Sequence, residues 1–290
     1  MRVVVAPEEV RARVREAKRG GLRAGFVPTM GALHEGHLSL VRRAREDAGL
    51  AVMSIFVNPL QFGPSEDFTR YPRDLARDRA LAEQAGVDLL WTPGTPDMYP
   101  VPPRITVAPG SAGDRLEGAS RPGHFAGVLT VVLKLFAIVE PDVAVFGRKD
   151  VQQASLIRGM VRDFNLPVRI VVAPTVRERD GLAMSSRNVF LEGGSRAEAT
   201  ALVRALRAGV EAFRGGERRG TAIEEAARRV FASTRVALDY VACASPEDFA
   251  PVETADAATV LAVAARVGGT RLIDNAVLGE GVEGDVYVAG

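Results

Sequence analysis

Short apolar runs alternate with longer helical patterns from the N-terminus to residue 176. The runs are rich in β-branched and other apolar residues and predict buried strands at 21–29, 51–58, 87–93, 143–147 and 168–177. The segments between them predict helices at 36–48, 74–86, 127–139 and 150–164. Strands that alternate with helices favour a parallel sheet covered on both faces, which is a doubly wound α/β fold.

The pattern changes near residue 176, where we place a domain boundary. A helix within 192–220 ends in a Gly-rich break, and a second helix is predicted at 221–233. Apolar runs then predict the strands of a small second sheet, at 236–244, 259–269 and 270–278. The sequence thus predicts a first domain over 1–176 and a smaller α+β domain over 177–290, whose last residues, 279–290, form a loosely held tail.

Charge and composition narrow the class of protein. Lys and Arg number 37 against 36 Asp and Glu, for a net charge of +1, so we expect no broad nucleic-acid surface. Cys243 is the single cysteine and lies in an apolar run, which predicts a buried, inert thiol. The N-terminus lacks the apolar core of a signal peptide, and no apolar run reaches the roughly 20 residues of a membrane span. We therefore expect a cytoplasmic protein with no membrane partner.

Two of the three histidines, His34 and His37, follow a turn at Gly31. The predicted helix begins near Glu35, and a helix N-terminus suits a phosphate because of its unpaired N–H groups and partial positive charge. Residues three apart share a helix face, so both rings can point at one anion. We favour a nucleotide phosphate site; a metal site and a purely structural pair are the alternatives. The third histidine, His124, lies in the stretch "RPGHFAG", and we expect it to have a specific role in a chain so poor in histidine.

Two further segments carry phosphate-binding chemistry. In "VFGRKDVQQ" a strand ends at Gly147, and Lys149, one of three lysines, follows beside Asp150. A lysine suits a phosphate and an aspartate suits a ribose hydroxyl or a metal ion, although a solvated turn has the same composition. In "RERDGLAMSSRN" two serines precede Arg187 in a donor-rich loop that could hold a polyphosphate and close as a lid, or simply connect the domains.

Polar residues also follow the strand predicted at 51–58. Asn58, Gln61 and Tyr71 suit the binding of a small polar substrate. The same segment contains Asn-Pro and Gly-Pro dipeptides, which are common in turns. Alone, this segment does not indicate a function.

Together, these motifs resemble a known family. "PTMGALHEGH" is similar to the HIGH-like signature of the nucleotidyltransferase superfamily, which includes class I aminoacyl-tRNA synthetases, and "MSSRN" is similar to its KMSKS-like signature. With "FVNPLQFG", "YPRD", "RPGHFAGVLTVVLKLF" and "GRKDVQQ", in this order, the first 190 residues resemble the pantothenate synthetases, or pantoate–β-alanine ligases. The chain departs from that pattern at Arg148, where the family usually has Glu, and at Val151, where an aromatic residue is common.

The resemblance implies a Rossmann-like first domain, a C-terminal lid domain and an AMP-forming ligase that works as a homodimer. Such enzymes join pantoate to β-alanine with ATP and Mg²⁺, through a pantoyl adenylate, and release AMP and pyrophosphate. The chemistry fits donor-rich loops, because adenylation needs positioning and charge stabilisation more than a protein nucleophile.

The resemblance also implies roles for individual residues. His34, His37, Lys149 and Arg187 would act on the phosphates as catalytic residues. The ATP site would further include Met30, Gly31, Gly147, Asp150, Val176, Met184, Ser185 and Ser186. Gln61 and Gln153 would hold pantoate, in a pocket shaped by Asn58, Tyr71 and Arg121. Asp78 would be a magnesium ligand, although Arg77 stands beside it where the family often has an acid.

Two other functions remain open. Another adenylate-forming nucleotidyltransferase would share the phosphate signatures, and a tRNA-dependent one would need a more basic surface than the cluster "RGGERRG" offers. A non-catalytic nucleotide-binding module would explain the phosphate-binding turns but not the polar residues Asn58, Gln61 and Gln153.

Overall fold

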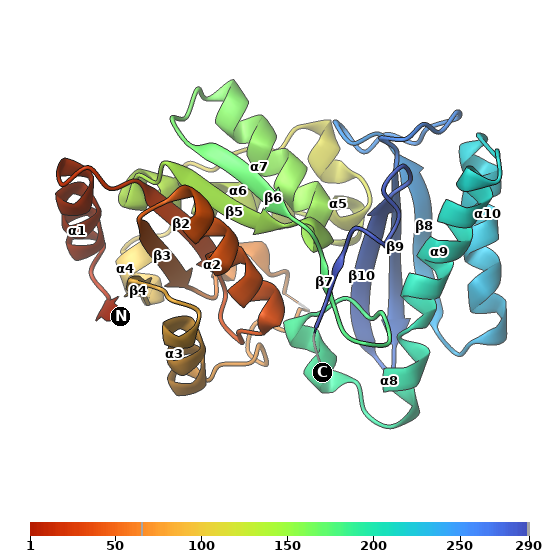
Figure 1. Ribbon diagram of the computed structural model, residues 1–290, viewed down its shortest axis with the longest axis horizontal. Helices are drawn as coiled ribbons and strands as arrows, with labels where there is room; N and C mark the ends of the chain where they lie inside the picture. The colour runs from red at the N-terminus through yellow and green to blue at the C-terminus, as the bar shows by residue number, and fades with distance from the viewer. Residues whose placement is uncertain (65, 289–290) are drawn as a thin grey trace. The chain divides into compact units, whose positions relative to one another are not determined.

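The computed structural model in Figure 1 describes residues 1–64 and 66–288, which form two compact units. The first unit contains Met1–Arg148 and Gln153–Ala173, and the second contains Lys149–Gln152 and the chain from Pro174 onward. The chain thus passes into the second unit after Ala173, where the sequence placed the boundary after Val176. Within the described residues, no helix is both long and apolar enough to cross a membrane.

The first unit is built on a six-stranded sheet in the order β1-β4-β3-β2-β5-β6, and every neighbouring pair is parallel. Its strands are β1 (Arg2–Val4), β2 (Ala24–Thr29), β3 (Leu50–Ile55), β4 (Leu89–Trp91), β5 (Val143–Gly147) and β6 (Arg169–Ala173). The edge strand β1 was not among the predicted elements, because three residues carry too short a pattern to stand out.

Helices connect these strands. They are α1 (Pro7–Arg19), α2 (Glu35–Asp47), α3 (Leu75–Gln84), α6 (His124–Val139) and α7 (Val151–Asp163), with the short turns α4 (Thr95–Met98) and α5 (Glu117–Ser120). Apolar side chains alternate along the strands between two separate cores. Phe26 on β2 packs in the core that includes residues of α1, α6 and α7, whereas its neighbour Val27 packs in the core that includes residues of α2 and α3. Burial on both faces confirms the predicted doubly wound α/β fold.

The strand order places a switch point between β2 and β5. The chain leaves β2 for β3 and β4 on one side of the sheet and later builds β5 and β6 on the other side. In open sheets of this kind, ligands bind outside the carboxyl ends of the strands at such a point. Here those ends are Thr29 on β2, just before Met30, and Gly147 on β5.

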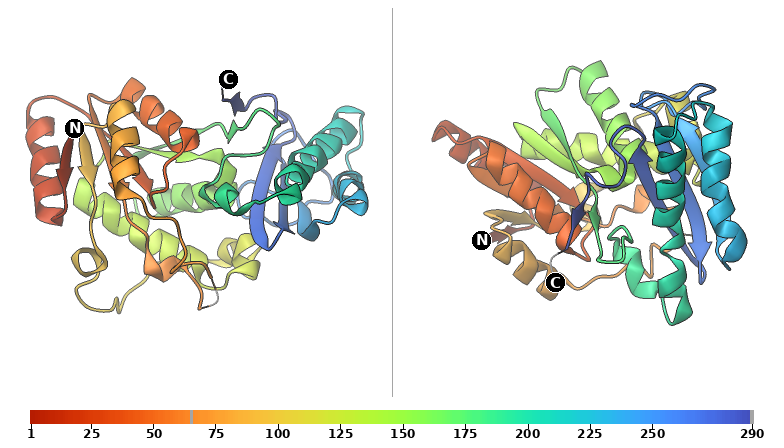
Figure 2. Two further views of the ribbon diagram at one scale, coloured as in Figure 1. Left: turned by 90° about the horizontal axis from the view of Figure 1, so that it is seen from below. Right: turned by 45° about the vertical axis from the view of Figure 1, so that its right-hand side comes forward.

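The second unit carries a three-stranded antiparallel sheet, β10-β9-β8, formed by β8 (Ala237–Ala244), β9 (Val260–Val267) and β10 (Thr270–Val277). Helices α9 (Ala201–Arg214) and α10 (Gly220–Arg228) pack against one face of this sheet, and the short α8 (Gly194–Glu198) precedes them (Figure 2). Cys243 on β8 is fully buried, and burial raises the pKa of its thiol to about 12, so the predicted buried thiol is confirmed.

Two expectations about this region were wrong. The run 168–177 is not one strand, because it forms β6 and, after Pro174, a separate strand β7 (Val176–Arg177) in another sheet. Pro174 has no N–H to donate to a ladder, which explains the break. The described part of the C-terminal segment is not a loose tail, because β11 (Val286–Tyr287) pairs in parallel with β7. The last two residues, 289 and 290, lie outside the described residues.

Candidate active site

A strained turn joins β2 to α2. Gly31 and Ala32 follow each other with φ of 82° and 50°, so two consecutive residues are in the left-handed region. Thr29 supports the turn, since its hydroxyl donates to the Ser54 carbonyl at 2.7 Å and accepts from the Gly31 N–H at 3.2 Å. The turn brings the chain sharply from the sheet edge into the first turn of α2, where His34 and His37 stand.

Asp78 on α3 fixes this turn. One carboxylate oxygen accepts the N–H of Ala32 at 2.8 Å and the other accepts the N–H of Leu33 at 2.7 Å. The neighbouring Arg77 donates to the Leu33 carbonyl at 3.1 Å. Asp78 is only 2% exposed, and it has a structural role that the sequence did not suggest. Both oxygens thus accept a backbone N–H group, and the role of Asp78 as a magnesium ligand stays a prediction.

The two histidines of α2 lie against each other at the helix N-terminus. Their ring centroids are 4.1 Å apart, and the His34 backbone N–H donates to Nδ1 of His37 at 3.3 Å. Because Nδ1 of His37 accepts this hydrogen bond, a neutral ring carries its proton on Nε2. His37 therefore presents an N–H donor next to the positive end of the α2 dipole, which is the arrangement an anionic oxygen requires.

Buried amides surround the 3₁₀ turn Pro59–Gln61, which follows β3. Asn58 is fully buried and donates from Nδ2 to Oε1 of Gln61 at 3.1 Å, while the Tyr99 hydroxyl donates to Asn58 Oδ1 at 2.9 Å. Gln61 in turn donates from Nε2 to the Met30 sulfur at 3.0 Å. The structure thus brings together three predicted site residues, Met30, Asn58 and Gln61. Tyr71 is 6% exposed nearby in the chain, with its ring edge-on to Phe62.

His124, whose role the sequence left undefined, fixes the backbone of Gln61. Its Nδ1 lies 2.8 Å from the Gln61 carbonyl oxygen and its Nε2 lies 3.0 Å from Nη1 of Arg121. Nδ1 therefore donates and Nε2 accepts, which requires the neutral ring. Burial lowers the pKa of His124 to about 4, and the charge of Arg121 acts in the same direction.

Arg121 contacts the same turn, and its positive charge is partly neutralised by a neighbouring carboxylate. Its Nη2 donates to the Gln61 carbonyl at 3.3 Å, and its guanidinium pairs with the Glu66 carboxylate. Burial raises the pKa of Glu66, but the hydrogen bond and charge of Arg121 outweigh this and hold the pKa below its usual value. Arg121 thus helps to hold the backbone of Gln61, and its pocket-shaping role stays a prediction.

Gly127 explains the rest of the "RPGHFAG" motif. A Cβ at this position would lie 2.1 Å from the Leu60 carbonyl oxygen and 2.7 Å from the Gln61 nitrogen. The missing side chain lets α6 approach the turn closely enough for the Gly127 carbonyl to accept from Asn58 Nδ2 at 3.2 Å. The motif therefore holds the turn that contains Gln61 in place. The sequence signal that could have identified this role is a histidine followed by a glycine three residues later, His124 and Gly127.

The remaining predicted residues fall into both units. Gly147 ends β5, and Gln153 lies in the first turn of α7. In the second unit, Lys149 forms an ion pair with Asp150 at 3.6 Å, and Lys149, Ser185 and Asn188 line one small pocket. The Ser185 hydroxyl accepts the Arg187 N–H at 3.3 Å, at the start of the 3₁₀ helix Ser186–Phe190. Val176 and Met184 are joined by a backbone hydrogen bond of 2.9 Å.

The fold and these side chains define an α/β protein with a polar site at the carboxyl edge of a doubly wound sheet. Residues 2–277 match the model of the family described as pantoate-beta-alanine ligase. Pantothenate synthetases from Geobacillus thermodenitrificans and Roseiflexus sp. are 52% and 54% identical over 279 residues, which cover 96% of this chain and 96% and 99% of theirs.

Solved structures of similar proteins point to the same family. The pantothenate synthetase of Thermus thermophilus has a TM-score of 0.91 at 48% identity and covers 96% of this chain and 99% of its own. The pantoate-beta-alanine ligase of Francisella tularensis, complexed with beta-gamma ATP and beta-alanine, has a TM-score of 0.78 at 31% identity and covers 98% and 100%. The chain therefore belongs to the pantoate–β-alanine ligase family, and the predicted class of enzyme, a ligase that forms an amide bond, is confirmed.

Proposed function

We propose that this ligase condenses pantoate with β-alanine in two steps and uses ATP to activate the acid. In the first step a carboxylate oxygen of pantoate attacks the α-phosphorus of ATP, and the bond to pyrophosphate breaks. In the second step the amine of β-alanine attacks the acyl carbon, loses a proton and displaces AMP. ATP and β-alanine are the ligands of the Francisella tularensis relative.

The observation that carries the proposal is the histidine pair at the start of α2. His37 presents an Nε2–H donor at a helix N-terminus, directly after the strand beside the switch point of the sheet. A donor fixed in advance can stabilise negative charge as it develops on the phosphates. In this proposal His34 and His37 bind phosphate oxygens, and His37 can protonate the departing group.

We assign the other residues in the same way. Lys149 and Arg187 would bind the developing negative charge, and the segment Met184–Ser186 would close over the triphosphate. The adenosine would lie against Val176, with its ribose and phosphates near Gly147 and Asp150 and the turn Met30–Gly31. These roles are supported by the matching motifs and by the donor chemistry of each side chain.

Pantoate would be bound by the amides of Gln61 and Gln153. The fixed position of Gln61 supports this role, because Asn58, Met30, His124 and Arg121 hold it from several sides. A side chain whose own position is fixed loses little entropy when it binds a ligand. Asn58, Arg121 and Tyr71 would then shape the pocket rather than donate to the substrate.

Mg²⁺ would accompany ATP and be held chiefly by the triphosphate, as is common for this ion. Asp78 accepts two backbone N–H groups, so we propose that it chiefly fixes the histidine turn while the triphosphate holds the ion. When bound, the ion would neutralise phosphate charge. The homodimer and the cytoplasmic location stay predictions from the resemblance and the sequence.

The test is exchange of pyrophosphate into ATP with Mg²⁺, with and without pantoate and without β-alanine. Exchange that requires pantoate supports the acyl-adenylate step. Replacement of Lys149 or His37 by Ala should lower this exchange by about 100-fold or more. The matched control is Lys18→Ala, because Lys18 pairs with Asp142 in the first unit and has no proposed role at the site.

Three results would contradict the proposal or a part of it. Binding of ATP without any exchange would favour a non-catalytic nucleotide-binding module. Exchange that depends on a different acid would favour another adenylate-forming enzyme. Full activity of a folded Lys149→Ala or His37→Ala variant would remove the proposed residue roles.

A further inference from the structure

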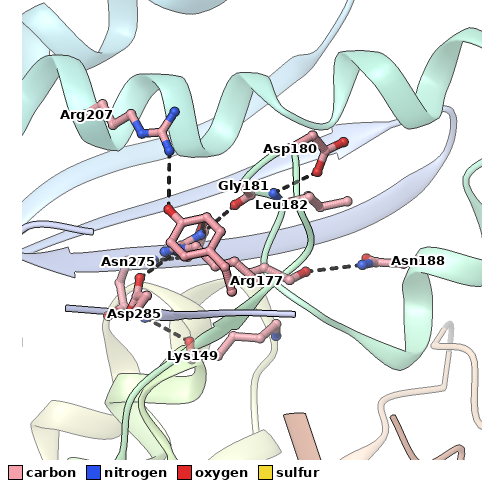
Figure 3. A network of polar contacts seen from close by, with 12 residues as sticks. Lys149, Arg177, Asp180, Gly181, Leu182, Asn188, Arg207, Asn275 and Asp285 are labelled. Atoms are coloured by element: carbon pink, nitrogen blue, oxygen red, sulfur yellow. Dashed lines mark hydrogen bonds and ion pairs between the residues drawn. The ribbon is translucent and has the colours of Figure 1, made fainter. Parts of the chain in front are cut away.

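Two adjacent residues of β10, Asp274 and Asn275, hold two separate segments of the second unit. Asn275 donates from Nδ2 to the backbone carbonyl of Lys149 at 2.9 Å. Asp274 accepts from both terminal nitrogens of Arg177, at 2.7 and 3.0 Å. Both β10 residues are buried, with exposures of 3% and 4%, so neither contact is a mobile surface pair. Figure 3 shows Asn275 and Lys149 together with Arg177 and Asp285 in one network of polar contacts.

Arg177 is the root of the loop that contains Ser185–Arg187. Its side chain is fully buried between two carboxylates, since its Nε donates to Asp285 at 2.6 Å while Asp274 takes the other end. It also donates to the Gly181 carbonyl at 3.0 Å, which ties the loop back onto its own start. Burial alone would lower the pKa of Arg177, but the two carboxylates raise it above its ordinary value, so the guanidinium stays charged.

The loop itself is held by further hydrogen bonds near that root. The Glu178 N–H donates to the Leu182 carbonyl at 2.8 Å. Asn188 donates from Nδ2 to the Glu178 carboxylate at 2.8 Å and to the Ala183 carbonyl at 3.1 Å. The loop therefore leaves Arg177 as a closed, internally bonded turn, and the position of Arg177 sets the position of the whole turn.

We propose that Asn275 is a positioning residue for Lys149, and that β10 fixes Lys149 relative to the loop of Ser185–Arg187 through the pair Asp274–Asn275. The proposal rests on the proposed function, in which Lys149 and this loop both act on the phosphates. Two observations support it independently. Lys149–Gln152 groups with the second unit although the preceding strand β5 lies in the first. Lys149, Ser185 and Asp274 also line the same pocket.

The physical reason is the geometry that phosphoryl transfer requires. Lys149 has a long, flexible side chain, so the position of its ammonium group depends on how firmly its backbone is fixed. A misplacement of about 1 Å at a reacting centre can cost about 100-fold in rate. The side-chain hydrogen bond from Asn275 to the Lys149 carbonyl restrains the backbone from which the Lys149 side chain extends, two residues after Gly147 at the end of β5.

The test replaces Asn275 by Asp. This change keeps the shape and one oxygen of the side chain but turns the donor that faces the Lys149 carbonyl into an acceptor. Asn165→Asp is the matched control: it makes the same chemical change at an exposed position with φ of 51°, which Asp also tolerates. Asn275→Ala is the second variant, for use if Asn275→Asp does not fold.

We expect the kcat of pantoate-dependent pyrophosphate exchange to fall by about 10- to 100-fold in the Asn275 variant that folds, and to be unchanged in Asn165→Asp. The KM for pantoate should stay within about twofold, because the proposed pantoate residues are elsewhere. A kcat equal to that of the control overturns the proposal. A fall in kcat together with a rise in KM and a fall in Tm overturns it too, since Asn275 would then support the fold as a whole and not Lys149 in particular.

Hydrogen exchange gives a readout that does not depend on the reaction. Amides of Lys149–Gln152 should exchange faster in Asn275→Asp than in Asn165→Asp, while those of β8 and β9 stay protected. Unchanged exchange in this segment overturns the positioning role even if the enzyme is active. Absence of pantoate-dependent exchange in the unchanged protein would instead contradict the proposed function, so the two failures are distinguishable.

Discussion

The carboxylate of Asp78 lies 2.7 Å from the backbone nitrogen of Leu33, although 45 residues separate them in the chain. The other oxygen of the same carboxylate accepts the N–H of Ala32. Helix α3, which also supplies the Arg77 hydrogen bond to the Leu33 carbonyl, thus fixes the turn from which His34 and His37 project. Precise presentation of the histidines depends on this distant acid.

We predict that Asp78→Asn lowers the free energy of unfolding by about 2 kcal/mol, because one buried N–H then faces an amide NH₂ and loses its acceptor. Adenylation should slow as well, while its dependence on Mg²⁺ concentration stays unchanged. Denaturant unfolding and pyrophosphate exchange measure the two effects. Asp97→Asn is the control, since Asp97 accepts the Gly94 N–H in the same way but at an exposed turn. A shifted Mg²⁺ dependence would instead restore Asp78 as a metal ligand.

Gly31 should not tolerate a side chain. Its φ is 82°, and an added Cβ would lie 2.9 Å from Asp78 Oδ2 and 3.0 Å from Ile55. Gly21 has a similar φ of 85° but open space around it. Gly21→Ala should therefore cost only the backbone strain, about 1 kcal/mol, whereas Gly31→Ala should cost roughly 1–3 kcal/mol more from overpacking. Equal unfolding midpoints for the two variants would contradict this account of the turn.

Stability should depend on pH through His124. Its pKa is about 4 in the folded protein against 6.5 for a free histidine, so between these values the unfolded chain binds more protons. The contribution is fully present above pH 6.5 and is lost as the pH falls toward 4. From pH 7 to pH 5 this one group should remove about 2 kcal/mol.

The environment of His124 supports this direction. Arg121 faces the ring and disfavours its charge, while the carboxylates Glu66 and Glu117 favour it less strongly than burial opposes it. Chemical denaturation at pH 7 and pH 5 gives the measurement, with His124→Asn as the comparison. The variant should be less stable at pH 7 yet lose less stability at pH 5. A variant with the same pH dependence as the unchanged protein would show that His124 does not set it.

The C-terminal segment should be essential for stability of the second unit. Asp285→Ala would leave the buried Arg177 with one carboxylate in place of two, and breaking a buried pair in this way costs about 3–5 kcal/mol. Glu283, two residues earlier, pairs with Arg214 on the surface, so Glu283→Ala is the matched control and should leave the unfolding midpoint almost unchanged. If both variants unfold alike, the Arg177 network is not what holds β11.

The sequence was sufficient for the main elements. Long segments with a clear hydrophobic period, such as α2, α6 and β3, were predicted because an element buried on one or both faces has apolar residues at regular positions in the sequence. Short or unusual elements were missed or misjudged. The strands β1 and β11 are only three and two residues long, and the second of them is held by Arg177 and not by an apolar pattern.

Among the site residues, the sequence indicated those whose chemistry stands out. His34, His37, Lys149 and Gln61 are polar or charged groups at the ends of predicted strands. The supporting roles could not be predicted, because the local sequence around Asp78 or Asn275 does not indicate which distant segment the side chain contacts.

The sequence by itself determined the fold class, the family and the identity of the chemical groups, because these follow from local pattern and from motifs that are continuous in the chain. The tertiary structure alone decided how those groups are held: His124 and Arg121 on Gln61, Asp78 on the histidine turn, and Asn275 on Lys149. The physical reason is that a buried hydrogen bond joins two groups by their positions in space, and segments far apart along the chain acquire those positions only when the core has packed.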